Sequence, residues 1–163
     1  MNDMVHALEP VLRPATGKTP LVFMFPGQTS RYPGMLDRLV ELHPRNRGLL
    51  AWACEVLGRD LATHYHVDNG DAAFTRNVDV QVGVFLANHM FLVTLETAGI
   101  DAEFSLGLSL GEWNHLVHIG VLSFEDALRA VEVRGRLYDE GPRGWAMPDD
   151  SETSANVPSP RLR

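Results

Sequence analysis

The sequence predicts an α/β fold built around a parallel sheet. Residues 20–25 (PLVFMF) and 102–108 (AEFSLGL) are short apolar segments whose length and Val, Phe and Leu content are typical of buried strands. Helical segments lie between and after them, at residues 45–58, 78–99 and 123–142, and this order is typical of α/β domains. Nearly continuous apolar strands indicate a sheet covered on both faces. Because two strands are few for such a sheet, the sequence also indicates that part of the fold is absent.

The composition is that of one globular domain. The chain has 163 residues, 45% of them hydrophobic, and a net charge of -7. This acidic balance argues against a general nucleic-acid-binding role, which would need a basic face. Cys54 is the single cysteine, so no internal disulfide can form, and a reducing, cytoplasmic location is expected. It lies in an apolar stretch, and we interpret it as a small buried side chain.

The first half of the chain divides into a leader, a strand, a loop and a helix. Residues 1–19 contain two prolines and a glycine and predict a loose leader. Residues 27–34 have the composition of a loop, and the helix of residues 45–58 closes at Gly58. Residues 59–74 show no clear hydrophobic period, and we expect them to be irregular.

Residues 78–99 form the most apolar segment. We expect a helix that begins near Asn77 or Asp79 and stops at Gly99. Its longest unbroken apolar run, residues 82–87, is much shorter than the roughly 20 residues that a membrane span needs. The segment therefore predicts a buried core helix, and we expect no membrane partner.

The helix of residues 123–142 has the clearest boundaries. Ser123 and Asp126 form an S-x-x-D capping pattern at its start, and Gly141 ends it. Residues 148–163 are rich in Pro and Ser with almost no apolar bulk, and we predict that this tail is disordered.

A G-x-S-x-G pattern, made by Gly107, Ser109 and Gly111, separates the second strand from a helix that starts near Gly111. In a nucleophile elbow, a serine lies on a strained strand-to-helix turn, and the glycines let strand and helix approach closely. The backbone N–H after the serine then points at a developing oxyanion. The pattern by itself is weak evidence, and a plain serine in a glycine turn is the alternative.

A general base for Ser109 is not evident. His115 lies six residues further along the same predicted helix, about 9 Å along the axis, which is too far for direct proton transfer. His64 and His66 could form a metal pair, but no other ligands accompany them, so we expect a surface loop and no metal site. His89 lies in the apolar helix and is interpreted as a core histidine.

Arg134 lies on the apolar side of the last helix, flanked by Ala130 and Leu137. A buried arginine needs an anionic partner. Either a structural carboxylate or the carboxylate of a ligand could serve, and the spacing leaves both open.

Four segments together resemble one known family. They read FPGQTSRYPGM at 25–35, GLSLGE at 107–112, GVLSFEDAL at 120–128 and VRGRLYDEGPRG at 133–144. In content and order they are similar to the motifs of malonyl-CoA:acyl carrier protein transacylases and of the acyltransferase domains of fatty-acid and polyketide synthases. The resemblance covers residues 20–147, which would be a partial acyltransferase domain, the N-terminal half or less of a family member.

The resemblance implies a hydrolase-like parallel sheet and an acyl-transfer site. Ser109 would accept the acyl group, the backbone N–H groups of Gln28 and Leu110 would form the oxyanion hole, and Arg134 would bind the carboxylate of a malonyl-type substrate. The implied partners are a coenzyme A thioester, as substrate, and an acyl carrier protein, with no other cofactor. Fatty-acid and polyketide biosynthesis both remain possible pathways.

Three positions depart from the family pattern. Leu108 replaces the usual histidine before the nucleophile, Thr29 replaces a glycine of the G-Q-G-S loop, and Tyr138 stands where Met is common. If position 29 needs a positive φ, threonine would be strained there. Acyl-chain specificity is therefore left open.

The resemblance also implies that segments of the family are lacking. The family's catalytic histidine and its small ferredoxin-like subdomain lie downstream of the serine, and we expect similarity to stop near Met147, as in a truncated or split gene. A complementing chain is then a further candidate partner, and the chain alone is expected to have little activity. A non-catalytic module that binds a carrier protein or a subunit remains an alternative. So does an acyl-thioester hydrolase, which Arg134 disfavours.

Overall fold

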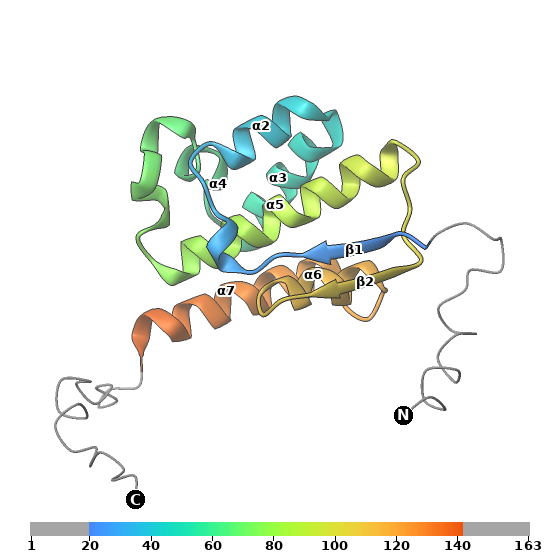
Figure 1. Cartoon of the computed structure of the whole chain (residues 1–163). Coiled ribbons are helices and arrows are strands. Elements are labelled where there is room, and N and C mark those ends of the chain that lie inside the picture. The colour runs from blue at the N-terminus through green and yellow to red at the C-terminus, as the bar shows by residue number, and fades with distance from the viewer. Residues whose placement is uncertain (1–19, 142–163) are drawn as a thin grey trace, which may run out of the picture.

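The computed structural model describes residues 20–141 (Figure 1). In chain order the elements are β1 (Val22–Phe25), the 3₁₀ helix η1 (Gln28–Ser30), α2 (Met35–Leu42), α3 (Pro44–Leu57), α4 (Leu61–His64), the 3₁₀ segment η2 (Val67–Phe74), α5 (Asn77–Thr97), β2 (Phe104–Gly107), α6 (Gly111–His118) and α7 (Phe124–Glu140). The predicted leader and the predicted disordered tail lie outside the described residues.

The two strands form a parallel sheet. Val22 pairs with Phe104 and Phe25 pairs with Gly107, so both strands end at the same edge. The chain that leaves β1 enters η1, and the chain that leaves β2 enters α6. The described part of the chain is thus mostly helical with a small parallel sheet, which agrees with the predicted α/β class in its coarse form.

Helix α5 is the centre of the core. In Figure 1 it lies between α2 and α3, above it, and β1 and α7, below it. From Val78 to Met90 almost every side chain is buried, as expected of a helix that is apolar on every face, whereas Phe91, Glu96 and Thr97 near its C-terminal end are exposed. By length and composition α5 is the one helix of residues 20–141 that could cross a membrane, but 72% of its most apolar window is buried within the fold. The prediction of a buried core helix is confirmed.

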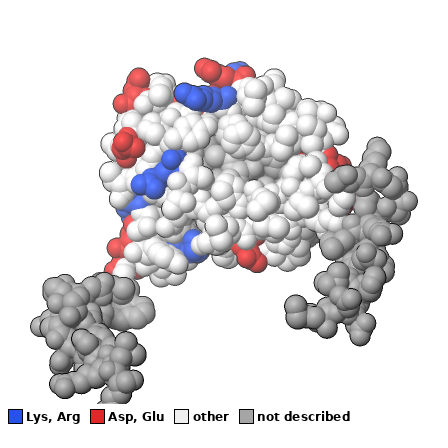
Figure 2. Space-filling model, viewed as in Figure 1, with Lys and Arg blue, Asp and Glu red and all other residues white. Residues whose placement is uncertain are grey.

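The strands are less covered than their composition predicts. Met24 is 71% exposed and Leu106 is 46% exposed, whereas Phe25 is buried. Helix α6 packs on one face of the sheet, where His118 lies against the rings of Phe23 and Phe25. Within residues 20–141 the opposite face is left largely open, and Figure 2 shows few charged side chains there. The expectation of a sheet covered on both faces is therefore wrong for this part of the chain.

Two regions contain more helix than expected. The sequence predicts no element where α2 lies. It predicts irregular structure for residues 59–74, but these residues contain α4 and η2. These are short helices held by side-chain caps: Asp60 accepts from the Thr63 N–H, and His66 accepts from the Asp68 N–H. Helices as short as these have no long hydrophobic period that could be detected in the sequence.

The surface-loop interpretation of residues 64–66 holds for His66, which is exposed, but is wrong for Tyr65. Tyr65 is 2% exposed, and its hydroxyl donates to the backbone oxygen of Asp79 at 2.6 Å. Burial raises the pKa of this phenol. His64 Nε2 lies 3.0 Å from the backbone oxygen of Ala73. Among residues 20–141, no group of three His, Cys, Asp or Glu side chains could hold a metal ion.

The predicted helix ends agree with the structure. Helix α3 ends at Gly58, which has left-handed backbone angles. Helix α7 begins after Ser123, whose hydroxyl oxygen accepts from the Asp126 N–H at 3.0 Å. Cys54 is half-buried and packs against the core, so it is less enclosed than expected.

Candidate active site

Ser109 lies on the turn between β2 and α6. Its φ is +53°, and it is the only non-glycine residue with a positive φ among residues 20–141. A side chain in this region costs on the order of 1–3 kcal/mol, and such strain is concentrated at functional sites. The serine is exposed at the edge where both strands end.

The two glycines of the motif allow this turn to form. A Cβ on Gly107 would overlap the backbone of Gly111 and Glu112. A Cβ on Gly111 would overlap the carbonyl oxygen of Phe25 and would lie 2.8 Å from that of Pro26. Only glycine therefore lets α6 begin directly against the end of β1.

Two backbone N–H groups beside the serine have no acceptor. These are the N–H groups of Gln28, in η1, and of Leu110, directly after Ser109; neither donates to any atom of residues 20–141. The turns that carry them are tied together by a hydrogen bond from the Leu108 N–H to the Phe25 oxygen at 3.0 Å. These are the two N–H groups that the family resemblance implies as an oxyanion hole.

The substitutions at positions 29 and 108 cause no backbone strain. Thr29 lies inside η1 and does not have a positive φ. The condition under which threonine would be strained is therefore not met. Leu108 is 70% exposed and points away from the core.

Arg134 reaches the serine from α7. Its Nη1 donates to Gln81 Oε1 at 2.5 Å, and its Nη2 donates to Ser109 Oγ and to the Tyr138 hydroxyl, each at 3.4 Å. The guanidinium also lies over the Tyr138 ring, 4.9 Å from its centroid. Close packing of α7 on α5, with Gly135 against the backbone of Val78, sets the position of this arginine.

Of the two partners expected for Arg134, the structural carboxylate is not found among residues 20–141. No carboxylate of residues 20–141 lies within salt-bridge distance of it, and its close partner is the neutral amide of Gln81. Gln81 is fully buried, and its Nε2 has no hydrogen-bond partner among the described residues. The sequence analysis missed Gln81, although a glutamine inside an apolar helix was a usable signal.

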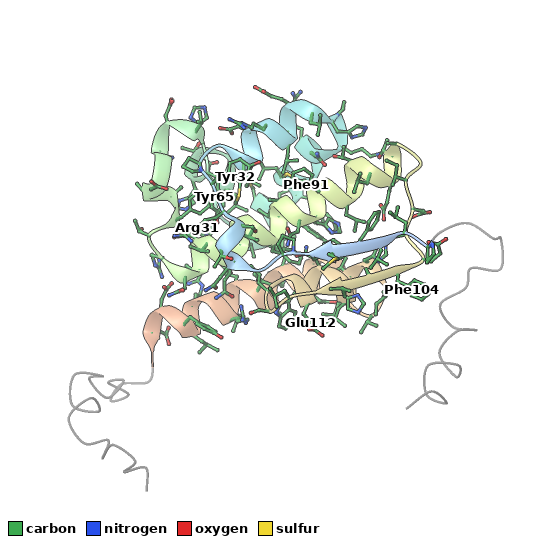
Figure 3. All side chains as sticks on the ribbon, viewed as in Figure 1. Arg31, Tyr32, Tyr65, Phe91, Phe104 and Glu112 are labelled. Atoms are coloured by element: carbon green, nitrogen blue, oxygen red, sulfur yellow. The ribbon has the colours of Figure 1, made fainter. Side chains whose placement is uncertain are left out.

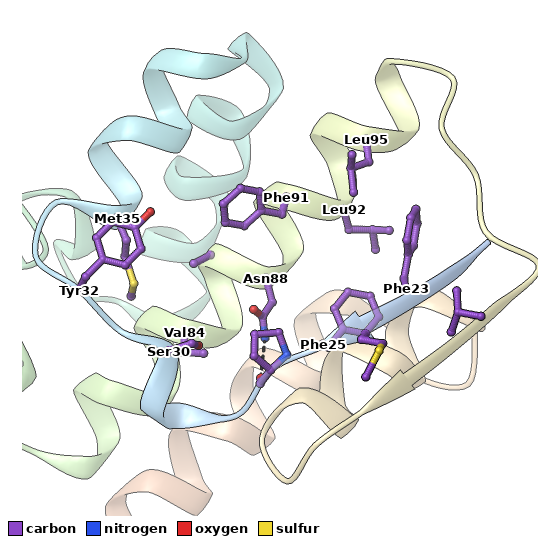
Figure 4. Close-up of a pocket in the computed structure, with 14 residues that line it drawn as sticks. Phe23, Phe25, Ser30, Tyr32, Met35, Val84, Asn88, Phe91, Leu92 and Leu95 are labelled. Carbon is purple, nitrogen blue, oxygen red and sulfur yellow. Dashed lines mark hydrogen bonds between the residues drawn. The ribbon is translucent and has the colours of Figure 1, made fainter.

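An apolar groove lies beside Arg134. It has a volume of about 440 Å³, and its walls include Trp113, Val133, Leu137 and Tyr138. A second cavity of about 350 Å³ lies between β1 and α5 and is lined by Phe25, Asn88 and Phe91 among others (Figure 4). Figure 3 shows Phe91 projecting from α5. Arg134 lines the groove and not the second cavity, whereas Ser109 lines neither. We therefore place the candidate site at the contact between Ser109 and Arg134, beside the groove.

No imidazole of residues 20–141 hydrogen-bonds to Ser109. His115 Nδ1 and His118 Nδ1 each lie 2.8 Å from Ser105 Oγ instead. Burial lowers the pKa of His89 to about 4, and its ring packs against Phe124, as expected of a core histidine. The described residues therefore hold a candidate nucleophile and anion site without a candidate base.

These features define a class of protein. An exposed serine on a strained strand-to-helix turn, next to unpaired backbone N–H groups, is typical of α/β enzymes that move acyl groups. The chain belongs to the acyl transferase domain family, whose sequence profile matches residues 22–158.

Named relatives agree with this family. The chain is 35% identical over 121 residues to the malonyl CoA-acyl carrier protein transacylase of Bacillus subtilis, a match that covers 74% of this chain and 38% of the relative. It is also 35% identical to the polyketide biosynthesis protein ThaF of Burkholderia thailandensis, over 75% of this chain and 10% of the relative. The chain thus spans little more than a third of the Bacillus relative.

Solved structures share the fold. The malonyl-transacylase in the PlMCAT:AntF complex with a type II PKS acyl-carrier protein matches with a TM-score of 0.70 and 31% identity, over 77% of this chain and 41% of that one. The acyl carrier protein S-malonyltransferase of Vibrio cholerae matches with a TM-score of 0.67 and 31% identity, over 76% and 40%. Each match covers about three quarters of this chain but less than half of the solved structure.

Proposed function

We propose that this chain carries the acyl-accepting half of an acyltransferase site. In this proposal the turn of Gly107, Ser109 and Gly111 is a nucleophile elbow. A malonyl-type group moves from a coenzyme A thioester to an acyl carrier protein through an ester on Ser109, in fatty-acid or polyketide biosynthesis in the cytoplasm. Coenzyme A is substrate here, and the chain's own residues need no further cofactor.

The reaction would run in two balanced steps. Ser109 Oγ attacks the thioester carbonyl, its proton passes to a base, and coenzyme A leaves as a thiol after taking up a proton. The phosphopantetheine thiol of the carrier then attacks the serine ester, forming the new thioester and restoring the hydroxyl. In both steps the negative charge on the carbonyl oxygen would be stabilised by the Gln28 and Leu110 N–H groups.

The single observation that carries the proposal is the contact between Arg134 and Ser109. A guanidinium with no carboxylate partner in the described fold lies 3.4 Å from the serine hydroxyl. The free carboxylate of a malonyl group is the kind of anion that such an arginine binds. A hydrolase of uncharged acyl chains would have no use for this positive charge.

The base and the rest of the site would come from elsewhere. We expect the base from a part of the acyltransferase domain outside residues 20–141, and a complementing chain is one source. The open sheet face, with Met24 and Leu106 exposed, supports a second candidate: a non-catalytic module that binds a carrier protein or a subunit.

The test is covalent labelling with radiolabelled malonyl-CoA. Wild-type chain should be labelled slowly, Ser109→Ala should not be labelled, and Arg134→Ala should lose at least about tenfold in rate. Arg136→Ala is the matched control, because Arg136 lies on the same helix but is exposed and pairs with Glu132. It should be labelled like wild type.

Adding carrier protein separates the remaining outcomes. Transfer of label to the carrier supports the transferase, and release of free malonate without the carrier indicates a hydrolase. Absence of label together with measurable carrier binding would favour the non-catalytic module.

A further inference from the structure

A pair of buried asparagines connects the three segments that meet behind the candidate site. Asn88, on α5, is 6% exposed, and Asn114, on α6, is fully buried. Asn88 Nδ2 donates to the Pro26 oxygen at 3.1 Å and to Asn114 Oδ1 at 3.0 Å. Asn114 Nδ2 donates to the Phe85 oxygen at 3.0 Å.

The pair lies where the two turns of the site are anchored. Pro26 precedes Gln28 by two residues, and Asn114 follows Leu110 by four. Asn88 points from α5 towards the loop after β1 (Figure 4). The chain of amides therefore joins the segment that carries the Gln28 N–H to the helix that begins after the Leu110 N–H, with α5 as the fixed support.

Two buried amides stabilise the fold only while their polar atoms are hydrogen-bonded. An unpaired buried amide costs about 1–3 kcal/mol, and an apolar pair of the same shape would pack without this requirement. Amide pairs fix distance and angle, which apolar contacts do not. Two N–H groups can stabilise one oxyanion only when both lie about 3 Å from it.

We infer that Asn88 and Asn114 are positioning residues: they hold the Gln28 and Leu110 N–H groups at the spacing needed for both to bind one oxyanion. This inference rests on the proposed function, because it concerns the same acyl-transfer site. Neither asparagine touches the substrate: each acts through the backbone that it holds.

The chain offers a matched control in Asn46. This asparagine is also fully buried and also bridges helices, with Nδ2 donating to the Leu39 oxygen at 2.8 Å and to Thr94 Oγ1 at 3.0 Å. It joins α3 to α2 and α5, away from both turns of the site. Asn46→Ala should lower stability as much as the site variants do, so it separates loss of stability from loss of positioning.

The first readout is amide hydrogen exchange, which does not depend on activity. Asn88→Ala and Asn114→Ala should each speed exchange at the Ser30, Leu108 and Gly111 amides, whose hydrogen bonds hold the two turns. Asn46→Ala should leave these amides unchanged. Equal exchange at these amides in wild type and both site variants would overturn the inference, whether or not the chain acylates.

The second readout is the rate of serine acylation by malonyl-CoA. We expect about a tenfold lower maximal rate in either site variant, with little change in KM, since binding through Arg134 is untouched. The double variant should be no slower than the slower single variant, because the two amides act as one unit. If wild type acylates and the site variants match it or Asn46→Ala in maximal rate, the inference is wrong. If wild type does not acylate, the proposed function fails and hydrogen exchange decides the positioning role.

Discussion

Replacing Gly111 by alanine tests whether the turn at Ser109 depends on close contact between α6 and β1. The added Cβ would overlap the Phe25 oxygen and lie 2.6 Å from the Phe25 carbonyl carbon and 2.8 Å from the Pro26 oxygen. Ordinary contacts of a Cβ are 3.4 Å or longer. Because all three neighbours are backbone atoms, α6 has to move, and overpacking of this kind costs about 1–3 kcal/mol.

The free energy of unfolding in urea measures this cost. With a urea dependence of about 1–3 kcal/mol per M, we expect Gly111→Ala to lower the midpoint by roughly 1 M. Gly48→Ala is the control, because no atom lies within 4 Å of its Cβ and the residue is inside α3. It should raise stability by about 0.5–1 kcal/mol. An unchanged midpoint in Gly111→Ala would refute the argument that only glycine fits there.

Three further predictions concern pH and the arginine. Burial lowers the pKa of His89 to about 4 in the fold, against about 6.5 in the unfolded chain. As pH falls, the unfolded chain therefore binds the proton first, and the free energy of unfolding falls by about 3 kcal/mol between pH 6.5 and 4. In His89→Leu, urea unfolding should show a smaller fall in the free energy of unfolding over this pH range. Burial alone would raise the pKa of Asp139, but hydrogen bonds from the N–H groups at the start of α5 outweigh it and lower the pKa. Asp139→Asn should therefore lower the thermal midpoint at pH 7, with a smaller difference once acid protonates the carboxyl. Tyr138→Phe keeps the ring over Arg134 but loses a long hydrogen bond, so KM for malonyl-CoA should rise about two- to fivefold in steady-state assays, and Tyr138→Ala should raise it further.

The outline of the fold could be predicted because its signals are local. The cap at Ser123 and the glycine at the end of α3 depend on residues next to them in sequence. The burial of the strands could not be predicted in this way, because apolar composition does not say how many helices cover a sheet. Tyr65 was missed for a similar reason, since its partner, the Asp79 carbonyl, is supplied by α5.

The candidate site was predicted unevenly. The turn at Ser109 follows from a short motif between a strand and a helix. The pairing of Arg134 with Gln81 joins residues 53 positions apart, and no local pattern contains that information. The same holds for the amide chain from Pro26 to Asn114, which exists only when three segments are brought together.

In the proposed reaction, Ser109 accepts a malonyl-type group whose carboxylate Arg134 binds. Peptide mapping by mass spectrometry after incubation with malonyl-CoA or acetyl-CoA tests it most directly. We expect an ester on Ser109, formed faster from malonyl-CoA than from acetyl-CoA, with this preference lost in Arg134→Ala. An ester on another residue, or a malonyl preference that survives in Arg134→Ala, would contradict it.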